Sequence, residues 1–221
     1  MKSSEGAASG VCEANQRGPL LHEIAVDDKF IGHLESEDAR VAARTQAGGC
    51  PHCQGRLDRA DYPRKPRGGD IAPAGEGIVR RISLCCAREG CRRRVTPPSL
   101  VFMGRRVYLA VVVWLACLRA ERSVKPRAIS PPQRTMARWL DWFRNILPGT
   151  DFFTAARARL SPPIEDVASL PGALLQRFIG KRTAADGLVA ALRFLSPLTT
   201  KSAPAGAGFL MDDSCHAELG A

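Results

Sequence analysis

The stretch that organises this chain runs from Cys50-Pro-His-Cys53 to Cys86-Ala-Arg-Glu-Gly-Cys91. Two residues separate the cysteines of the first pair, and four separate those of the second. Paired thiols at such spacings, each pair on a turn-forming segment, supply the four soft ligands that a tetrahedral zinc ion prefers. We therefore predict a structural Zn²⁺ site of the zinc-ribbon type, with Cys50, Cys53, Cys86 and Cys91 as its ligands.

Other assignments of this site stay open. Cys85 competes with its neighbour Cys86, and His52 is placed to replace a thiolate. The 32 residues between the pairs exceed the commonest ribbon spacing, and the four thiols could also be unliganded. A catalytic metal ion is disfavoured because no nearby acid or histidine completes a general-base constellation. Three cysteines lie outside the pattern, and the middle one is expected in the core: Cys12, Cys117 and Cys215.

Positive charge gathers beside the cysteines. From Arg56 to Arg144 the chain has 20 Lys and Arg residues against 7 Asp and Glu, an excess of +13, while the whole chain carries +10. A pI near 9.6 fits a polyanionic partner, and the clustering favours nucleic acid over a solvated basic surface. DNA is the expected partner. RNA stays open because zinc ribbons and arginine-rich loops bind both.

The sequence predicts a cytoplasmic protein without a membrane partner. Residues 1–19 are polar and have no apolar stretch typical of a secretory signal. In the reducing cytoplasm, closely paired cysteines indicate metal binding rather than disulfides. The longest apolar run, Val107 to Leu118, has 12 residues, which is too short to cross a bilayer and suits a buried core segment.

Helix and strand signals predict a mainly α protein with a small zinc-bound β element. Ser36, followed by two acids, is expected to cap a helix that ends before Gly48. Val79 to Cys85 alternates as a strand, Arg105 to Ala120 is expected as a buried helix, and Pro162 to Leu195 as two or three shorter helices. The predicted organisation is a flexible tail, an N-terminal helical segment, a zinc ribbon, a helix-turn-helix-like region, C-terminal helices and a disordered tail, at residues 1–19, 20–49, 50–98, 99–148, 149–198 and 199–221.

A further amphipathic helix is predicted between Ser130 and Leu147. Ser130 is expected as its N-cap, with proline at the first helical position and Gln133 at the third, and the helix should stop before Pro148. Apolar residues recur at helical spacing along one stripe: Met136, Trp139, Leu140, Phe143 and Leu147. The opposite face carries Arg134, Arg138, Asp141 and Asn145.

This helix is a candidate DNA-recognition helix. With the buried helix before it and the segment from Glu121 to Ile129 as a middle helix, it would complete a helix-turn-helix, although Pro126 interrupts that middle helix. An amphipathic surface helix of a small bundle is the alternative. We predict base or phosphate contacts for Gln133, Arg134 and Arg138. The other predicted DNA contacts are basic residues in and after the ribbon: Arg64, Lys65, Arg67, Arg92, Arg93, Arg94, Arg105 and Arg106.

Residues 50 to 147 resemble the zinc-ribbon and helix-turn-helix regions of bacterial insertion-sequence transposases, and those of small accessory proteins encoded in mobile elements. Three segments carry the resemblance: Cys50-Pro-His-Cys53, Leu84-Cys85-Cys86 to Cys91-Arg92-Arg93-Arg94, and Thr135-Met-Ala-Arg-Trp139. It implies binding to transposon-end or promoter DNA. It does not imply catalysis, because the acids after Leu147 fall on predicted loops, helix starts or the tail, and not at the strand ends of an RNase-H-like domain.

The expected function is therefore that of a non-enzymatic, zinc-dependent DNA-binding protein of a mobile element. The alternative is an assembly module that docks on a transposase or recombinase, which the apolar segments Leu170 to Phe178 and Leu188 to Leu198 favour in part. An enzyme is disfavoured, because the sequence offers no nucleophile–base pair, no phosphate-binding glycine motif and no redox Cys-x-x-Cys in a thioredoxin context.

Overall fold

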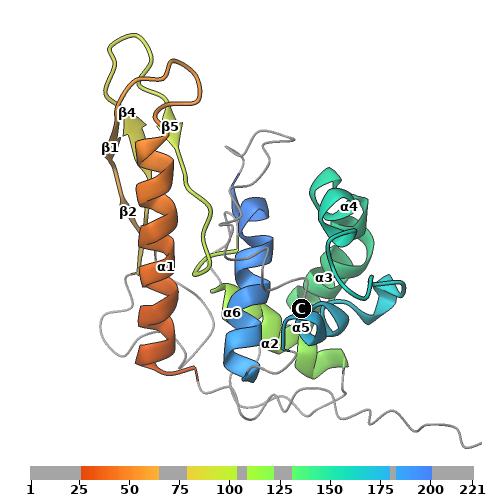
Figure 1. Cartoon of the computed structure of the whole chain (residues 1–221). Coiled ribbons are helices and arrows are strands. Elements are labelled where there is room, and N and C mark those ends of the chain that lie inside the picture. The colour runs from red at the N-terminus through yellow and green to blue at the C-terminus, as the bar shows by residue number, and fades with distance from the viewer. Residues whose placement is uncertain (1–25, 65–78, 104–108, 122–130, 180–182, 201–221) are drawn as a thin grey trace, which may run out of the picture.

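The computed structural model of the protein describes residues 26–64, 79–103, 109–121, 131–179 and 183–200, and these are mainly helical (Figure 1). Within them lie six α-helices: α1 (Asp28–Ala47), α2 (Ala110–Glu121), α3 (Gln133–Asp141), α4 (Asp151–Arg157), α5 (Gly172–Ile179) and α6 (Ala184–Leu195). Shorter π- and 3₁₀-helical turns are η3 (Trp142–Ile146), η4 (Leu147–Gly149), η5 (Val167–Ser169) and η6 (Ser196–Thr199). The prediction of a mainly α fold is confirmed. In the described part of the chain, no helix combines the length and the apolar character needed to cross a bilayer.

Short antiparallel strands form a small β element beside the C-terminal half of α1 (Figure 1). They are β1 (Leu57–Arg59), β2 (Tyr62–Arg64), β3 (Val79–Arg81), β4 (Leu84–Cys86) and β5 (Arg94–Val95). One sheet has the order β1-β4-β5, with Leu57 opposite Cys86 and Leu84 opposite Val95, and a second pairs β2 with β3. We call residues 50–64 and 79–95 the cysteine unit.

The expected single strand from Val79 to Cys85 is divided into β3 and β4. At the break, the backbone N–H of Ser83 donates to the carboxylate of Asp61 at 3.1 Å instead of to a backbone carbonyl. The carbonyl of Ser83 still accepts from Ala60 at 2.8 Å, so β1–β2 and β3–β4 form one interrupted hairpin. The interruption depends on a side chain far away in sequence, which a period-two pattern does not reveal.

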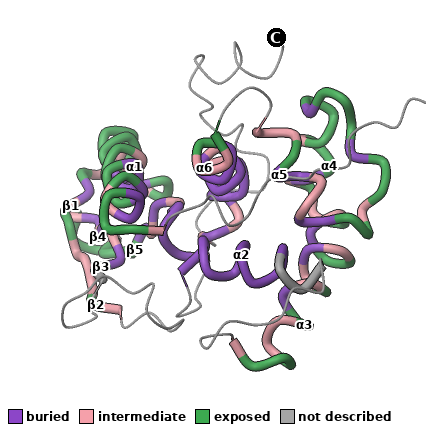
Figure 2. The backbone as a smooth tube through the Cα atoms, turned by 90° about the horizontal axis from the view of Figure 1, so that it is seen from below, coloured by how far each residue is buried: buried purple, intermediate pink, exposed green. Residues whose placement is uncertain are grey.

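Apolar side chains gather in two separate clusters. The larger one, here called the helical core, takes side chains from α1, from residues 100–102 and from α2 to α6, and α2 lies at its centre (Figure 2). Residues 109–118 are all buried, and Trp114 contacts Phe143 edge to face with ring centroids 5.3 Å apart. The smaller cluster lies inside the cysteine unit and consists of Cys50, Leu57, Leu84, Cys86 and Val95. The predicted burial of Cys117 is confirmed.

The N-terminal helix begins earlier than the sequence pattern indicated. Asp27 is its N-cap, and the Asp27 carboxylate accepts from the Phe30 N–H at 2.8 Å. The predicted cap, Ser36, lies inside the helix and its hydroxyl donates to the Gly32 carbonyl. The predicted start was wrong because aspartate is as good an N-cap residue as serine. Asp27 therefore caps the helix, and Asp28 is the acid of its first turn. The predicted end is confirmed, since Gly48 is the C-cap.

Helix α3, in contrast, begins later than predicted. Its first residue is Gln133 and its N-cap position is Pro132, so the expected capping box is not formed by Gln133 at the third position; Ser130 lies outside the described residues. The carbonyl of Pro132 accepts from Thr135 and Met136 and starts the helix. The predicted apolar stripe is confirmed, because Trp139, Phe143 and Leu147 are buried while Met136 and Leu140 pack against the core.

The last third of the chain folds onto the helical core. It holds α5 and α6, as predicted, and also α4, which the sequence reading did not single out. The Arg193 guanidinium of α6 forms an ion pair with Glu37 of α1 at 2.7 Å. The hydroxyl of Thr199 accepts from the Ser99 N–H at 2.9 Å, and that of Thr200 donates to the Thr96 carbonyl at 2.6 Å. The expected middle helix of a helix-turn-helix, at residues 121–129, lies almost wholly outside the described residues.

A buried carboxylate joins α1 to the segment that follows the cysteine unit. Asp38, in the middle of α1, accepts from the hydroxyl of Ser99 and from the Leu100 N–H at 2.5 Å. Burial raises the pKa of Asp38 to about 6, although these donors and the buried Arg81 guanidinium oppose the rise. Arg81, from β3, donates to the Pro97 carbonyl at 2.7 Å. Four segments distant in sequence, which contribute Asp38, Arg81, Ser99 and Thr199, thus meet at one polar junction.

Asp38→Ala should lower the free energy of unfolding by about 2–4 kcal/mol, because two buried donors lose their acceptor. Chemical denaturation followed by far-UV CD measures the change. The matched control is Glu35→Ala on the exposed face of the same helix, which should change the free energy by less than about 0.5 kcal/mol. Equal effects of the two substitutions would contradict the role of the junction.

Candidate metal centre

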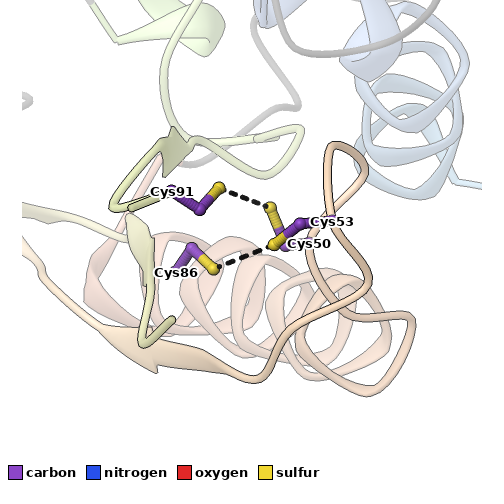
Figure 3. A group of neighbouring side chains, drawn as sticks. All are labelled: Cys50, Cys53, Cys86 and Cys91. Atoms are coloured by element: carbon purple, nitrogen blue, oxygen red, sulfur yellow. Dashed lines mark hydrogen bonds between the residues drawn. The ribbon is translucent and has the colours of Figure 1, made fainter. Parts of the chain in front are cut away.

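The four predicted thiols meet at one point of the cysteine unit (Figure 3). Their sulfur atoms all lie within 4.8 Å of one another, with 3.4 Å between Cys53 and Cys86 and 3.8 Å between Cys50 and Cys91. A tetrahedral ion with metal–sulfur bonds of about 2.3 Å places its ligands about 3.8 Å apart. The group therefore has the size and the donor set to hold a metal ion. All six described cysteines are free of disulfides.

The two loops that carry the thiols share one hydrogen-bond pattern. In the first loop, the N–H groups of Cys53 and Gln54 donate to the Cys50 carbonyl. The Cys50 N–H donates to the Gly55 carbonyl and so closes the loop. In the second loop, the N–H groups of Cys91 and Arg92 donate to the Arg88 carbonyl. The Cys86 N–H donates to the Arg93 carbonyl and closes this loop. The residue after each second cysteine has a positive φ, 58° at Gln54 and 44° at Arg92. The two turns thus have matching backbone closures, and their thiols converge on one point.

Backbone N–H groups point at three of the sulfur atoms, each from two residues further along the chain. The Gly55 N–H lowers the pKa of Cys53 to about 7. The Arg88 N–H acts in the same direction on Cys86, but burial and the other thiols raise the pKa of Cys86 to about 12. The pKa of Cys91 is also raised, because the neighbouring thiols and burial outweigh the Arg93 N–H. These N–H donors would stabilise thiolates, and binding of a cation would release the remaining protons.

Gly55 is a site residue that the sequence reading missed. A Cβ atom at this position would lie 3.2 Å from the Cys86 sulfur and 3.3 Å from the Cys53 sulfur. The absence of a side chain thus lets the backbone of the first loop approach both sulfurs. The signal in the sequence was a glycine two residues after the last cysteine of the tight pair.

The two competing ligands lie outside the cluster. Cys85 points away from Cys86, because neighbours on β4 face opposite sides, and its thiol donates to the Arg92 carbonyl at 3.5 Å. His52 is exposed, and its Nδ1 accepts from the Arg93 guanidinium at 2.9 Å. Among the described residues, the four cysteines form the only group of this kind.

The predicted DNA contacts of the cysteine unit are exposed or half-exposed. Arg92, Arg93 and Arg94 are exposed beside the second cysteine loop, and Arg64 ends β2. Arg88, which the prediction did not include, is also exposed and donates to the Cys53 carbonyl at 3.5 Å. Four of the predicted contacts lie outside the described residues: Lys65, Arg67, Arg105 and Arg106.

The predicted polar face of α3 is exposed. Gln133, Arg134 and Arg138 are solvent-accessible, whereas Trp139 of the same helix is buried. No side chain caps the N-terminus of this helix. The exposed Asp141 on the same face accepts from Asn145 at 2.7 Å.

Comparison with known proteins gives no match: no family model fits the chain, and no curated protein and no solved structure matches it.

We expect the purified protein to bind one zinc ion per chain, and Cys50→Ser or Cys91→Ser to abolish binding and unfold the cysteine unit. Closing such a site contributes on the order of 10 kcal/mol of folding free energy. Metal content, far-UV CD and the thiolate-to-cobalt charge-transfer band of the Co²⁺-substituted protein measure the outcome. Cys85→Ser is the matched control and should keep all three signals. Full zinc content in Cys50→Ser would contradict the ligand set.

Gly55→Ala should weaken zinc binding by about 10- to 100-fold, the usual loss when a group supporting the ligands is disturbed. Competition with a chromophoric chelator measures the affinity. Gly32→Ala on α1 is the control, because a Cβ atom there meets nothing within 4 Å. An unchanged zinc affinity of Gly55→Ala would show that the loop accommodates a Cβ atom, and would contradict the role of Gly55.

Proposed function

We propose that this protein is a non-enzymatic, zinc-dependent DNA-binding protein. The observation that carries the proposal is that exposed arginines, among them Arg88, Arg92 and Arg93, occupy the same loops as the four-cysteine cluster. A second exposed cationic surface lies on α3. Guanidinium groups held on a rigid scaffold bind phosphate oxygens with little loss of side-chain freedom.

Zinc is the metal we propose for the cluster. Four thiolates in a tetrahedron select zinc or iron among the common biological metals. Zinc is favoured as a structural ion, because a closed set of four protein ligands leaves no open position for a substrate. In this role the cysteines, with the N–H donors of Gly55, Arg88 and Arg93, would fix the loops that carry the arginines.

Helix α3 is the proposed reader of the DNA groove. Its first residues, Gln133 and Arg134, are exposed at a helix end whose N–H groups have no side-chain cap. The positive end of the helix dipole favours an approaching phosphate, and glutamine and arginine match the edges of adenine and guanine. Arg138 lies one turn further along the same exposed face.

The proposed association with a mobile element rests on the resemblance of residues 50 to 147 to transposase DNA-binding regions. Transposon-end or promoter DNA is accordingly the proposed target class.

An assembly module that docks on a transposase or recombinase is the alternative function. Its sequence argument was the apolar character of the segments around α5 and α6. In the structure these side chains lie largely inside the helical core: Leu170, Leu174, Leu175, Leu188, Ala191, Leu192, Phe194 and Leu195 are buried. Because the fold itself accounts for these segments, they no longer favour a docking role, and DNA binding remains the better-supported proposal.

Binding to duplex DNA should be steep in salt and should be lost on removal of zinc. Each phosphate contact contributes about 0.9 to the magnitude of the slope of log affinity against log salt concentration. Fluorescence anisotropy over a salt series, with and without a chelator, measures both effects. Arg134→Ala and Arg138→Ala should each reduce either this slope or the discrimination between sequences.

The control for these substitutions is Arg157→Ala on α4, which removes one exposed charge from another helix. It should leave the salt slope unchanged. A duplex RNA of the same sequence separates the two nucleic acids. Absence of DNA binding at low salt by the zinc-loaded protein would refute the proposal and favour the assembly module.

A further inference from the structure

Tyr62, at the start of β2, stands within a cluster of arginines. The guanidinium of Arg64 lies over its ring at 5.1 Å from the centroid, and that of Arg94 at 5.6 Å. Arg64 also donates to the Tyr62 hydroxyl at 3.5 Å. One aromatic ring therefore positions two guanidinium groups that come from different sheets.

The second arginine of the pair is fixed by further contacts. Arg94 donates from one nitrogen to the Ala60 carbonyl at 3.2 Å and to the Ser83 hydroxyl at 3.3 Å. Both acceptors are neutral, so they orient the guanidinium without cancelling its charge. The nearby carboxylate of Asp61 accepts from Arg59 at 2.6 Å and from the Ser83 N–H.

A third arginine lies behind the pair. Arg81 faces Tyr62 across the β2–β3 ladder, is 3% exposed and has a buried guanidinium nitrogen, Nη1, without a hydrogen-bond partner. The Asp38 carboxylate attracts the Arg81 guanidinium while Arg64 repels it, and an anion bound at Arg64 and Arg94 would offset this repulsion further. A phosphodiester suits such a site, since its oxygens match the planar donor fork of arginine.

Strand β2, which ends at Arg64, lies toward the same side of the molecule as the proposed recognition helix. In Figure 2, strand β2 and helix α3 both lie toward the lower edge of the view, at its left and right, and the buried helix α2 lies between them. A single extended polyanion on that side could therefore meet both surfaces.

We propose that Arg64 and Arg94, positioned by the ring of Tyr62, form a binding site for a phosphate of the DNA backbone. The site rests on the proposed function and adds Tyr62 to it as a positioning residue. The ring holds the two charges before DNA arrives, so fewer rotamers are lost on binding.

The test is DNA affinity and its salt slope for four variants of the zinc-loaded full chain. Arg64→Ala should reduce the magnitude of the slope by about 0.9, the contribution of one phosphate contact. Tyr62→Ala should weaken binding about two- to fivefold, as expected for the loss of an exposed cation–π contact. Tyr62→Phe keeps the ring and should bind like the wild type. Arg157→Ala removes the same charge elsewhere and should leave the slope unchanged.

Zinc content and far-UV CD of each variant report on folding. If Tyr62→Ala loses zinc, its weaker DNA binding would reflect unfolding. Arg64→Ala then tests the phosphate site, because Arg64 lies at the end of β2 and outside the cysteine cluster. Arg64→Ala binding with the wild-type slope, while Arg134→Ala binds more weakly, would overturn this site and leave the proposed function standing. A zinc-loaded wild type that binds no DNA would overturn both.

Discussion

The convergence of four thiols within 4.8 Å is the constraint on which the cysteine unit depends. Apart from cysteines, its buried apolar cluster contains only Leu57, Leu84 and Val95. So small a core cannot offset the entropy of ordering two loops and five short strands. A metal ion shared by the thiols would supply the missing free energy, and the arginines on those loops would then be ordered only while the metal is bound.

Helix α1 connects the cysteine unit to the helical core. Its 20 residues span about 30 Å, and its first half packs into the helical core through Phe30, Ile31 and Leu34. Near its end, Gln46 donates to the Leu57 carbonyl of the cysteine unit at 2.8 Å. Between these ends, Asp38 binds the segment at Ser99 and Leu100. The basic cysteine loops and α3 therefore belong to one packed structure. A ligand that contacts both would not need to order them separately, so less conformational entropy would be lost on binding.

The sequence alone predicted the parts of the fold that local signals determine. The thiol spacing identified the four cysteines that the fold brings together. The length and all-round apolar character of its segment predicted the buried helix α2, and helical periodicity predicted the buried stripe of α3. Local signals failed where distant residues determine the structure. Asp61 divides the predicted strand at Ser83, and Asp38, predicted in the first turn of a helix capped by Ser36, is a buried acceptor in the middle of α1. Gly55 and Tyr62 were missed for the same reason, since their roles depend on atoms brought close only by the fold.

The acids and arginines of the chain are sorted in space, and this bears on function. Several acids are used within the fold: Glu37 pairs with Arg40 and Arg193, Asp61 with Arg59, and Asp38 lies at the buried junction. Such partly exposed pairs contribute little to stability, and Glu89 stays exposed in the second cysteine loop beside the arginines. The arginines left exposed there repel one another and so cost stability. A bound polyanion, as in the proposed function, would offset this repulsion, because the field that destabilises the free protein would attract such a partner.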